Sequence, residues 1–271
     1  MVESLYIFCG LLDGGLYAKM TLTLKPMTLE RLHMTNAGTA NSTEATSVAI
    51  VGQPISRSQL ESLIAEATQP LVFEACDFEG VDLSRLNLRN FEFRDCAFME
   101  ASLYAASLSQ TTWVRCRGRQ ADFEAAELVD AQFLNCDLNN TKWRRARLSS
   151  AIFKECKLTG ANFEEAAHLG LCFEDTLLIG ADLRKMSFRK TQLQQLDFSE
   201  ADLSGCDFRE AVFVGGSLRN AHLKLTRFEG ADLREADIGG LKLVDAKLFR
   251  GATISLNQAA ELLGELGITV A

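Results

Sequence analysis

The sequence is short of the residues on which most enzymes depend. Only 3 histidines occur in 271 residues, and His33, His168 and His222 lie far apart in the chain. A catalytic histidine needs its partner within hydrogen-bond reach, and a metal needs several ligands that converge on one point. No glycine-rich phosphate-binding pattern is present either. These absences favour a protein that is not an enzyme and that needs no cofactor or metal.

Excess basic charge and long apolar runs are also missing. The net charge is −8, which argues against nucleic acid as a direct partner, because binding to phosphates depends on a basic surface. The apolar stretch at residues 5–12 is too short to span a membrane, and no basic residue precedes it as in a secretory signal. The sequence therefore predicts a cytoplasmic protein without membrane contact.

What the sequence does contain is a five-residue repeat. A large apolar residue stands at every fifth position from Phe73 to Leu248, and only Gly118 and His168 interrupt the series. Two positions before each of these centres stands a small residue, usually Ala, Cys or Thr. A period of five fits neither a helix nor a strand, so the chain must turn once per unit. Cysteines at that small position recur with every fourth unit, at Cys76, Cys96, Cys116, Cys136 and Cys156.

Because the cysteines recur every four units, the sequence predicts an all-β solenoid in which four units form one square coil. Each coil has four five-residue sides, with the large centres and the small residues inside. About nine coils, spaced about 4.8 Å apart as in a parallel ladder, would make a rod of roughly 43 Å. Stacked cysteines are too far apart for a disulfide and cannot converge on zinc. We expect them to be free and buried, which suits a reducing compartment.

The segments outside the repeat predict the ends of the rod. Residues 1–47 are expected to be a disordered extension, residues 48–70 a strand and a capping helix with Ser56 or Ser58 as N-cap, and residues 71–252 the repeat. Residues 253–271 are expected to form a second capping helix and an apolar tail. One face of the helix is enough to cover the last coil, so the additional apolar tail predicts a symmetric dimer. Its interface would include Leu262, Leu263, Leu266, Ile268 and Val270.

The repeat, with units such as Ala181-Asp182-Leu183, resembles the pentapeptide-repeat family. Residues 48–52, 167–171 and 258–270 resemble in particular the Qnr-type fluoroquinolone-resistance proteins. The resemblance implies a right-handed quadrilateral β-helix of pentapeptide repeats with short N- and C-terminal capping helices. It also implies a homodimer joined at the C-terminal caps that binds DNA gyrase and topoisomerase IV and protects them from inhibitors. Many Qnr-type proteins carry loops that bulge from the coils, whereas no insertion is visible in this register.

Surface charge predicts where such a partner would bind. When residues are sorted by their place in the four-unit period, the two sides that contain Phe73 and Phe78 carry a net charge of −7, and the other two carry +3. One hypothesis is that the acidic sides imitate DNA; the alternative is that these charges only keep the rod soluble. B-DNA over about 43 Å carries roughly 25 charges, so the imitation would be partial. The candidate residues are Glu74, Asp77, Glu79, Glu92, Asp95, Glu174, Asp175, Asp232 and Glu235.

The two interruptions are the other candidate contacts. Arg117, Gly118 and Arg119 replace an apolar centre by glycine between two cations, and His168 with Gly170 disturbs a later coil. Departures from a local rule often mark functional places, but either interruption could be a tolerated packing fault. The competing function is a protein-interaction scaffold with no topoisomerase partner, since one fold serves many roles.

Overall fold

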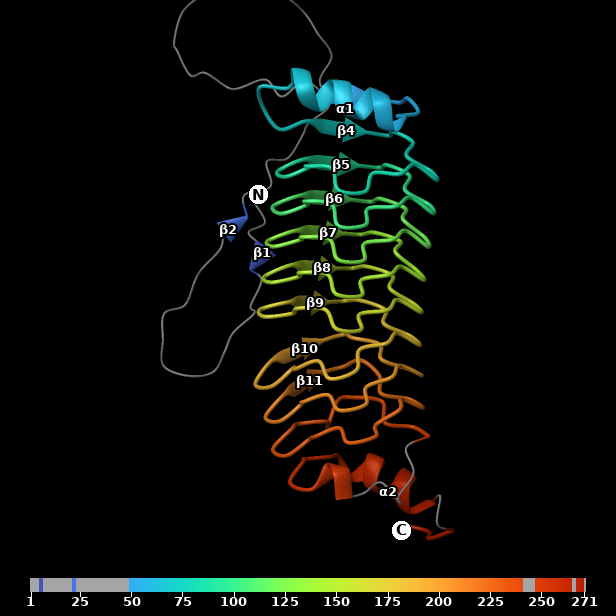
Figure 1. The fold of residues 1–271 in the computed structure, drawn as a ribbon. Helices are drawn as coiled ribbons and strands as arrows, with labels where there is room; N and C mark the ends of the chain where they lie inside the picture. The colour runs from blue at the N-terminus through green and yellow to red at the C-terminus, as the bar shows by residue number, and fades with distance from the viewer. Residues whose placement is uncertain (1–4, 7–20, 23–48, 241–246, 265–266, 271) are drawn as a thin grey trace, which may run out of the picture.

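The computed structural model describes residues 5–6, 21–22, 49–240, 247–264 and 267–270. Two short strands, β1 and β2, pair antiparallel, and β3 to β11 form one parallel nine-stranded sheet in sequence order. A helix stands near each end of the stack of coils (Figure 1). The elements are β1 (Leu5–Tyr6), β2 (Thr21–Leu22), β3 (Ala49–Val51), α1 (Arg57–Glu66), β4 (Val72–Glu74), β5 (Glu92–Arg94), β6 (Thr112–Val114), β7 (Gln132–Leu134), β8 (Ile152–Lys154), β9 (Cys172–Glu174), β10 (Gln192–Gln194), β11 (Val212–Val214) and α2 (Leu256–Gly264).

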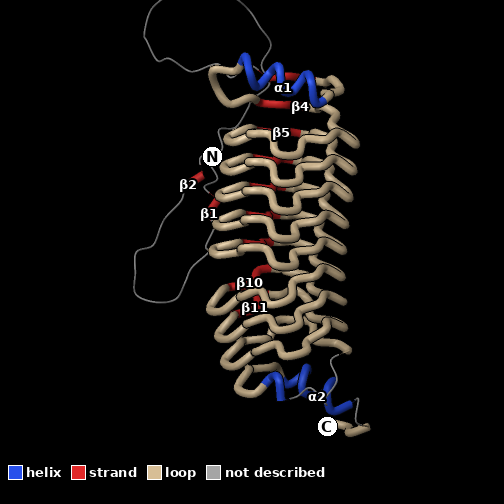
Figure 2. Tube along the Cα trace, in the orientation of Figure 1, coloured by secondary structure: helices blue, strands red, loops and turns tan. Residues whose placement is uncertain are grey.

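The fold is the predicted parallel β-solenoid. Strands β4 to β11 recur once per coil at the predicted period, and Phe73 pairs with Phe93, so Cys76 and Cys96 lie in successive coils as expected. The other three sides of each coil are too short to count as strands and pair through isolated bridges (Figure 2). We call residues 71–75 and the equivalent residues of every later coil side 1, and residues 76–80, 81–85 and 86–90 with their equivalents sides 2, 3 and 4.

The corners explain why the unit has five residues. At sides 2 to 4 the third residue of a β-turn has a positive φ, as in the turn closed by Val81 N–H and Phe78 C=O at 3.1 Å, where Gly80 has φ 65°. The same backbone conformation recurs every fifth residue, and residues other than glycine, such as Asn90 and Asn140, also adopt it. Each corner redirects the chain, so the centre of the next unit points inward again.

The core is a continuous stack of large side chains. Phe78 lies parallel to Phe98 with ring centroids 4.6 Å apart, and Phe93 meets Phe98 edge to face at 5.2 Å. Such aromatic pairs contribute about 0.5–1.5 kcal/mol each beyond the burial of their area. The small position has a second task, because Cys96 Sγ donates to Phe73 C=O of the preceding coil at 3.5 Å. A small donor such as Cys or Thr therefore fits there better than a larger apolar residue.

Side chains from the two helices close the ends of the rod. Ser56 caps α1 in a reciprocal capping box with Gln59. Arg57 donates to the carbonyl oxygens of Asp82 and Ser84 at 2.9 and 3.2 Å. At the other end Gln258 Nε2 donates to two carbonyl oxygens of the last coil, those of Leu233 and Ala236, at 2.7 and 2.6 Å. Carbonyl groups that a further coil would otherwise bind are satisfied in this way.

The register is not free of insertions, which corrects the expectation from the sequence. Asp232 pairs with Thr253, one position later than the period requires, whereas Val212 pairs with Asp232 at the regular spacing. The ring that stacks on Phe228 belongs to Phe249, at 4.9 Å, and not to the side chain at position 248. The expected ninth coil includes residues 241–246, which lie outside the described residues, as does most of the expected N-terminal extension.

Candidate functional site

The structure places every predicted acidic residue on sides 1 and 2, which meet at one corner of the rod. Four of these acids are neutralised by a neighbouring base. The carboxylate of Asp95 accepts two hydrogen bonds from Arg115, one coil further on, both at 2.7 Å. The other pairs are Glu92 with Arg94 at 2.6 Å, Glu174 with Lys154 at 2.6 Å, and Asp232 with Arg234 at 2.5 Å.

Pairing and burial change the pKa values of these acids in opposite directions. Hydrogen bonds from Arg115 lower the pKa of Asp95 below its usual range, and those from Arg234 do the same for the pKa of Asp232. Burial raises the pKa of Asp175, and the neighbouring carboxylate of Glu174 adds to the increase. Asp95 and Asp232 are therefore charged but locally compensated, whereas Asp175 is an acid without a base of its own.

The remaining acids carry the negative charge of this surface. In the described part of the chain Glu74, Asp77, Glu79, Asp175 and Glu235 make no ion pair. Sequence reasoning missed four further acids of the same kind, namely Glu100, Glu155, Asp197 and Glu200, on the same two sides. Side-chain cations on sides 1 and 2 that make no ion pair within the described ranges are those of Arg117 and Lys157. We call these nine acids the free acids. A base two positions or one coil away does not separate them from the paired acids, because Glu74 has Arg94 one coil away and Glu155 has Lys157 two positions away.

Sides 3 and 4 differ because their acids are largely compensated. On side 3, Arg184 lies 2.6 Å from Asp182, 3.3 Å from Glu164 and 3.8 Å from Asp202. On side 4, Glu127 contacts both Arg89 and Arg147, at 3.1 and 3.4 Å. Pairing removes acids and bases in equal number, so the nine free acids and two free cations leave sides 1 and 2 with the same net charge of −7, concentrated on fewer side chains.

The first interruption has a packing explanation. Gly118 occupies an inward-facing position, and a Cβ atom added there would lie 3.0 Å from Leu138 Cδ2, well inside van der Waals contact. Trp113, one of the two largest core side chains, is the preceding centre of the same coil and is 1% exposed. The space of the missing side chain is thus taken by its neighbours. Arg119 binds Asp137 at 2.8 Å, and Arg117 is exposed.

The second interruption places an imidazole between two coils. His168 Nδ1 lies 3.0 Å from Ala166 C=O, and His168 Nε2 lies 3.1 Å from Ser187 N. Because a backbone N–H can only donate, Nε2 is the acceptor and Nδ1 carries the proton. Leu169 next to it is 83% exposed, and Gly170 has a positive φ of 72°. The ring therefore bonds to backbone groups in the ladder, where the repeat would place an apolar centre in the core.

The predicted dimer residues lie at the C-terminal end of the rod. Leu262 and Leu263 on α2 are half-buried, and Ile268 and Val270 beyond it are 47% and 53% exposed. Leu266 lies outside the described residues. An apolar surface at the end of the rod is therefore partly open to solvent.

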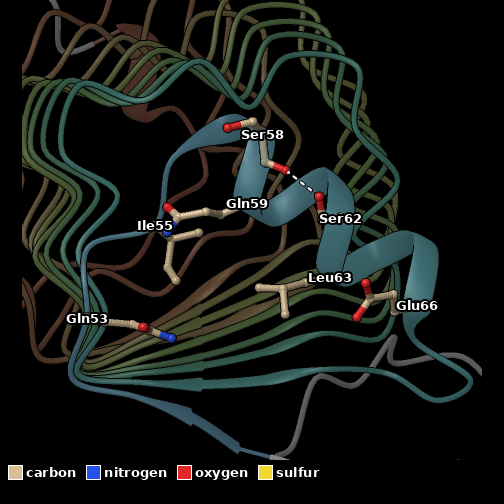
Figure 3. Close-up of a pocket in the computed structure, with 7 residues that line it drawn as sticks. All are labelled: Gln53, Ile55, Ser58, Gln59, Ser62, Leu63 and Glu66. Carbon is tan, nitrogen blue, oxygen red and sulfur yellow. Dashed lines mark hydrogen bonds between the residues drawn. The ribbon is translucent and has the colours of Figure 1, made fainter.

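A shallow pocket of about 380 Å³ lies beside α1. Figure 3 shows it between the helix and the turn after β3, lined mainly by polar side chains such as Gln53 and Glu66. Within the described residues, no three His, Cys, Asp or Glu side chains are grouped so that they could hold a metal ion. Among the helices that the structure describes, none is both long and apolar enough to cross a bilayer.

The buried cysteines are structural. The thiols of Cys76, Cys96, Cys116, Cys136, Cys156 and Cys206 are free and buried, and Cys172 is buried as well. Burial raises the pKa of Cys206 to about 12 and also raises the pKa of Cys116 and Cys136. A thiol that does not ionise near neutral pH is a poor nucleophile and a poor metal ligand.

These features define a β-solenoid built from five-residue units. A family model described as "Pentapeptide repeat region" matches residues 69–143, 88–163 and 126–196, and a second, "Pentapeptide repeats (8 copies)", matches residues 211–248. The chain belongs to the pentapeptide-repeat family. No curated protein matches its sequence at a significant level.

Solved structures resemble the fold. A trypsin-treated variant of QnrB1, a plasmid-mediated fluoroquinolone resistance protein, matches with a TM-score of 0.54 and 23% identity over 83% of this chain and 98% of that one. Full-length QnrB1 matches with a TM-score of 0.50 and 21% identity over 82% and 98%. HetL, from the cyanobacterium Nostoc sp. strain PCC 7120 and involved in heterocyst differentiation regulation, has a TM-score of 0.35 and 20% identity over 74% and 91%. At these identities the likeness establishes the fold alone.

Proposed function

We propose that this protein binds a type II topoisomerase, DNA gyrase or topoisomerase IV, and protects it from quinolone-like or peptide inhibitors. The observation that carries the proposal is the row of free acids on sides 1 and 2 of the rod. A basic DNA-binding surface would attract this row as it attracts the phosphates of a duplex. The protein acts in the cytoplasm as a binding protein, without catalysis.

Charge density limits the proposed DNA imitation. The free acids are spread over coils about 4.8 Å apart, whereas B-DNA carries one charge per about 1.7 Å. The rod therefore binds its partner through a part of the electrostatic pattern of DNA, and shape must supply the rest. Binding that depends on such exposed charges weakens as salt rises, because the Debye length is about 8 Å at 0.15 M.

A supercoiling assay tests this function. Purified protein is added to gyrase and to topoisomerase IV in the presence of ciprofloxacin, and we expect recovery of activity at micromolar protein. Neither rescue nor inhibition of either enzyme at that dose would remove the topoisomerase hypothesis and leave the interaction scaffold.

Charge variants then test the surface. One variant carries Glu74→Gln, Asp77→Asn, Glu79→Gln and Glu155→Gln, four free acids of sides 1 and 2. The matched control removes the same charge from sides 3 and 4, through substitutions to amides at Asp122, Glu124, Glu127 and Asp182. We expect the first variant to bind at least about tenfold more weakly at low salt, because rim charges act on the association rate. Equal affinities of the two variants would show that the acidic sides are not the contact.

The exposed apolar residues at the C-terminal end support a homodimer, which would place two rods end to end. Ile268→Lys with Val270→Lys is expected to give a monomer in light scattering after size-exclusion chromatography, because buried lysines are costly in an interface. Val51→Lys is the control, since Val51 is 58% exposed on β3 at the opposite end of the rod. A dimer that survives both substitutions in the tail would place the interface elsewhere.

A further inference from the structure

Between the first coil and the register slip near the C-terminal end, the described hydrogen-bond ladder is most strongly interrupted at one level. On side 4 the usual bond joins an N–H to a carbonyl oxygen of the preceding coil, as from Ala167 to Ala146 at 2.9 Å and from Asp207 to Met186 at 3.0 Å. The equivalent bond between Ser187 N–H and Ala166 C=O is replaced by the His168 ring, which bonds to both groups at 3.1 and 3.0 Å. Two hydrogen bonds and a ring thus stand where one hydrogen bond stands in other coils.

The neighbouring ladder bonds are missing at the same level. The described residues show no bond from His168 N–H to Ser187 C=O, although Leu148 and Phe188 make the equivalent bonds at 2.8 Å. The bond from Gln192 N–H to Leu171 C=O is missing there as well, whereas its equivalent from Val212 measures 2.9 Å. Strand β10 pairs with β9 only through Gln194 and Glu174, and elsewhere in the sheet three residues pair.

The opposite side of the rod is closed at this level. On side 2, Leu178 N–H donates to Asp197 C=O at 2.8 Å, and on side 3, Leu183 N–H donates to Asp202 C=O at 3.0 Å. The two coils that His168 separates are joined by Leu158 N–H to Leu177 C=O at 2.8 Å on side 2 and by Phe163 N–H to Asp182 C=O at 2.9 Å on side 3. Among the described residues the bond from Glu165 N–H to Arg184 C=O is absent, so the separation runs from the end of side 3 through side 4 to the first part of side 1. Figures 1 and 2 show the coils from β10 onward inclined to those before β9.

Core packing agrees with a local opening. Phe173 and Phe188, on the two sides of the break, are each 6% exposed, whereas Phe153 and Phe208 in regular coils are 0% exposed. Met186 fills an inward position where the other coils after the first have Ala, Cys or Thr, and it is 2% exposed. A larger side chain at this place occupies volume that an apolar centre at position 168 would otherwise fill.

We propose that His168 is a wedge that makes this level the joint at which the rod bends. Fewer ladder bonds and a more open core lower the local free energy of opening, while the coils on either side stay rigid. The joint changes the angle between the two halves of the rod without breaking either half. It is a property of the rod and does not depend on the proposed topoisomerase partner.

Hydrogen exchange at single-residue resolution tests the joint in the unaltered protein. The amides of His168, Gly170 and Gln192 lack the ladder bond and are expected to exchange at least about tenfold faster than the equivalent amides of Leu148, Ser150 and Val212. Equal protection of the two sets would overturn the proposal.

Substitution tests the role of the imidazole. His168→Leu combined with Met186→Ala returns both positions to the residues of the repeat. We expect protection at Gly170 and Gln192 to rise to the level of regular coils, and small-angle scattering to give a straighter rod. His222→Leu, an exposed position on side 3, is the matched control and should change neither measurement. A folded double variant with unchanged protection at Gly170 and Gln192 would show that the ring does not hold the coils apart, and a double variant that fails to fold leaves the exchange rates of the unaltered protein to decide.

Discussion

Gly118 gives the sharpest test of whether an interruption of the repeat is a packing solution or a contact. Its φ lies outside the left-handed region, so alanine is free of backbone strain there, and only space is in question. A Cβ atom would stand 3.0 Å from Leu138 Cδ2, whereas carbon atoms pack best at about 3.5–4.0 Å. Leu138 is 1% exposed and cannot move away freely. We expect Gly118→Ala to lower the free energy of unfolding by about 1–3 kcal/mol, as overpacking does.

A double-mutant cycle separates this clash from other causes. Leu138→Ala alone should cost about 2–5 kcal/mol through the cavity it leaves. Once Leu138 is truncated, the added methyl group at 118 has room, so the double variant should be no less stable than Leu138→Ala. The coupling energy would then be about 1–3 kcal/mol. Urea unfolding followed by tryptophan fluorescence measures it, since Trp113 and Trp143 are both buried.

The control places the same truncation far from Gly118. Leu218 is a fully buried centre on the same side of the rod, five coils further on. Gly118→Ala and Leu218→Ala should therefore be additive within about 0.5 kcal/mol. A neutral Gly118→Ala, or equal coupling to Leu138 and Leu218, would refute the packing explanation. Activity of the double variant in the supercoiling assay would then show whether Gly118 is needed for contact with a partner.

Three further predictions concern the ends, the thiols and the surface pairs. Gln258→Leu should lower stability by about 1–3 kcal/mol in thermal unfolding, because the carbonyl group of Ala236 loses its donor in a buried site and that of Leu233 keeps only the Ala236 N–H; a stability within error of the parent would mean that water replaces the amide. In a variant that replaces Cys9, the cysteine outside the described residues, by Ser, the buried thiols should react with a disulfide reagent only after denaturation, since burial shields them and raises the pKa of Cys116 and Cys206; fast reaction of the native protein would contradict this. Asp95 has a lowered pKa, so its pair with Arg115 stabilises the fold above the usual aspartate pKa, and the contribution is lost as pH falls through the lowered value. Because both side chains are more than a third exposed, Asp95→Asn should cost less than about 1 kcal/mol at pH 7 and nothing in strong acid.

Much of the fold follows from the sequence because one physical rule repeats. A large centre and a small inward residue in every unit fix the side of the chain that faces the core, and the regular cysteine spacing fixes the size of the coil. The slip in the last coil escaped this reasoning for a specific reason. Apolar residues stand at both 248 and 249, so the repeat pattern cannot show that Phe249 is the one that stacks on Phe228.

The candidate site was only partly predictable. The sequence placed the acids on two sides, but their net effect depends on contacts between coils, such as that of Asp95 with Arg115. Both interruptions were located, yet their consequences depend on atomic contacts. The side chain of Leu138 occupies the space beside Gly118, whereas the ring of His168 lies between two coils and binds backbone groups. A one-dimensional pattern shows where a rule fails and not how neighbouring side chains respond.

The contacts of the two helices with the ends of the rod have an evolutionary consequence. Arg57 and Gln258 bind carbonyl groups of the outermost coils, so neither contact depends on the number of coils between them. Duplication or loss of one four-unit segment in the interior would lengthen or shorten the molecule by a fixed step and leave both termini intact. Simple gene rearrangements can therefore change the length of the rod and the extent of the partner surface that it contacts.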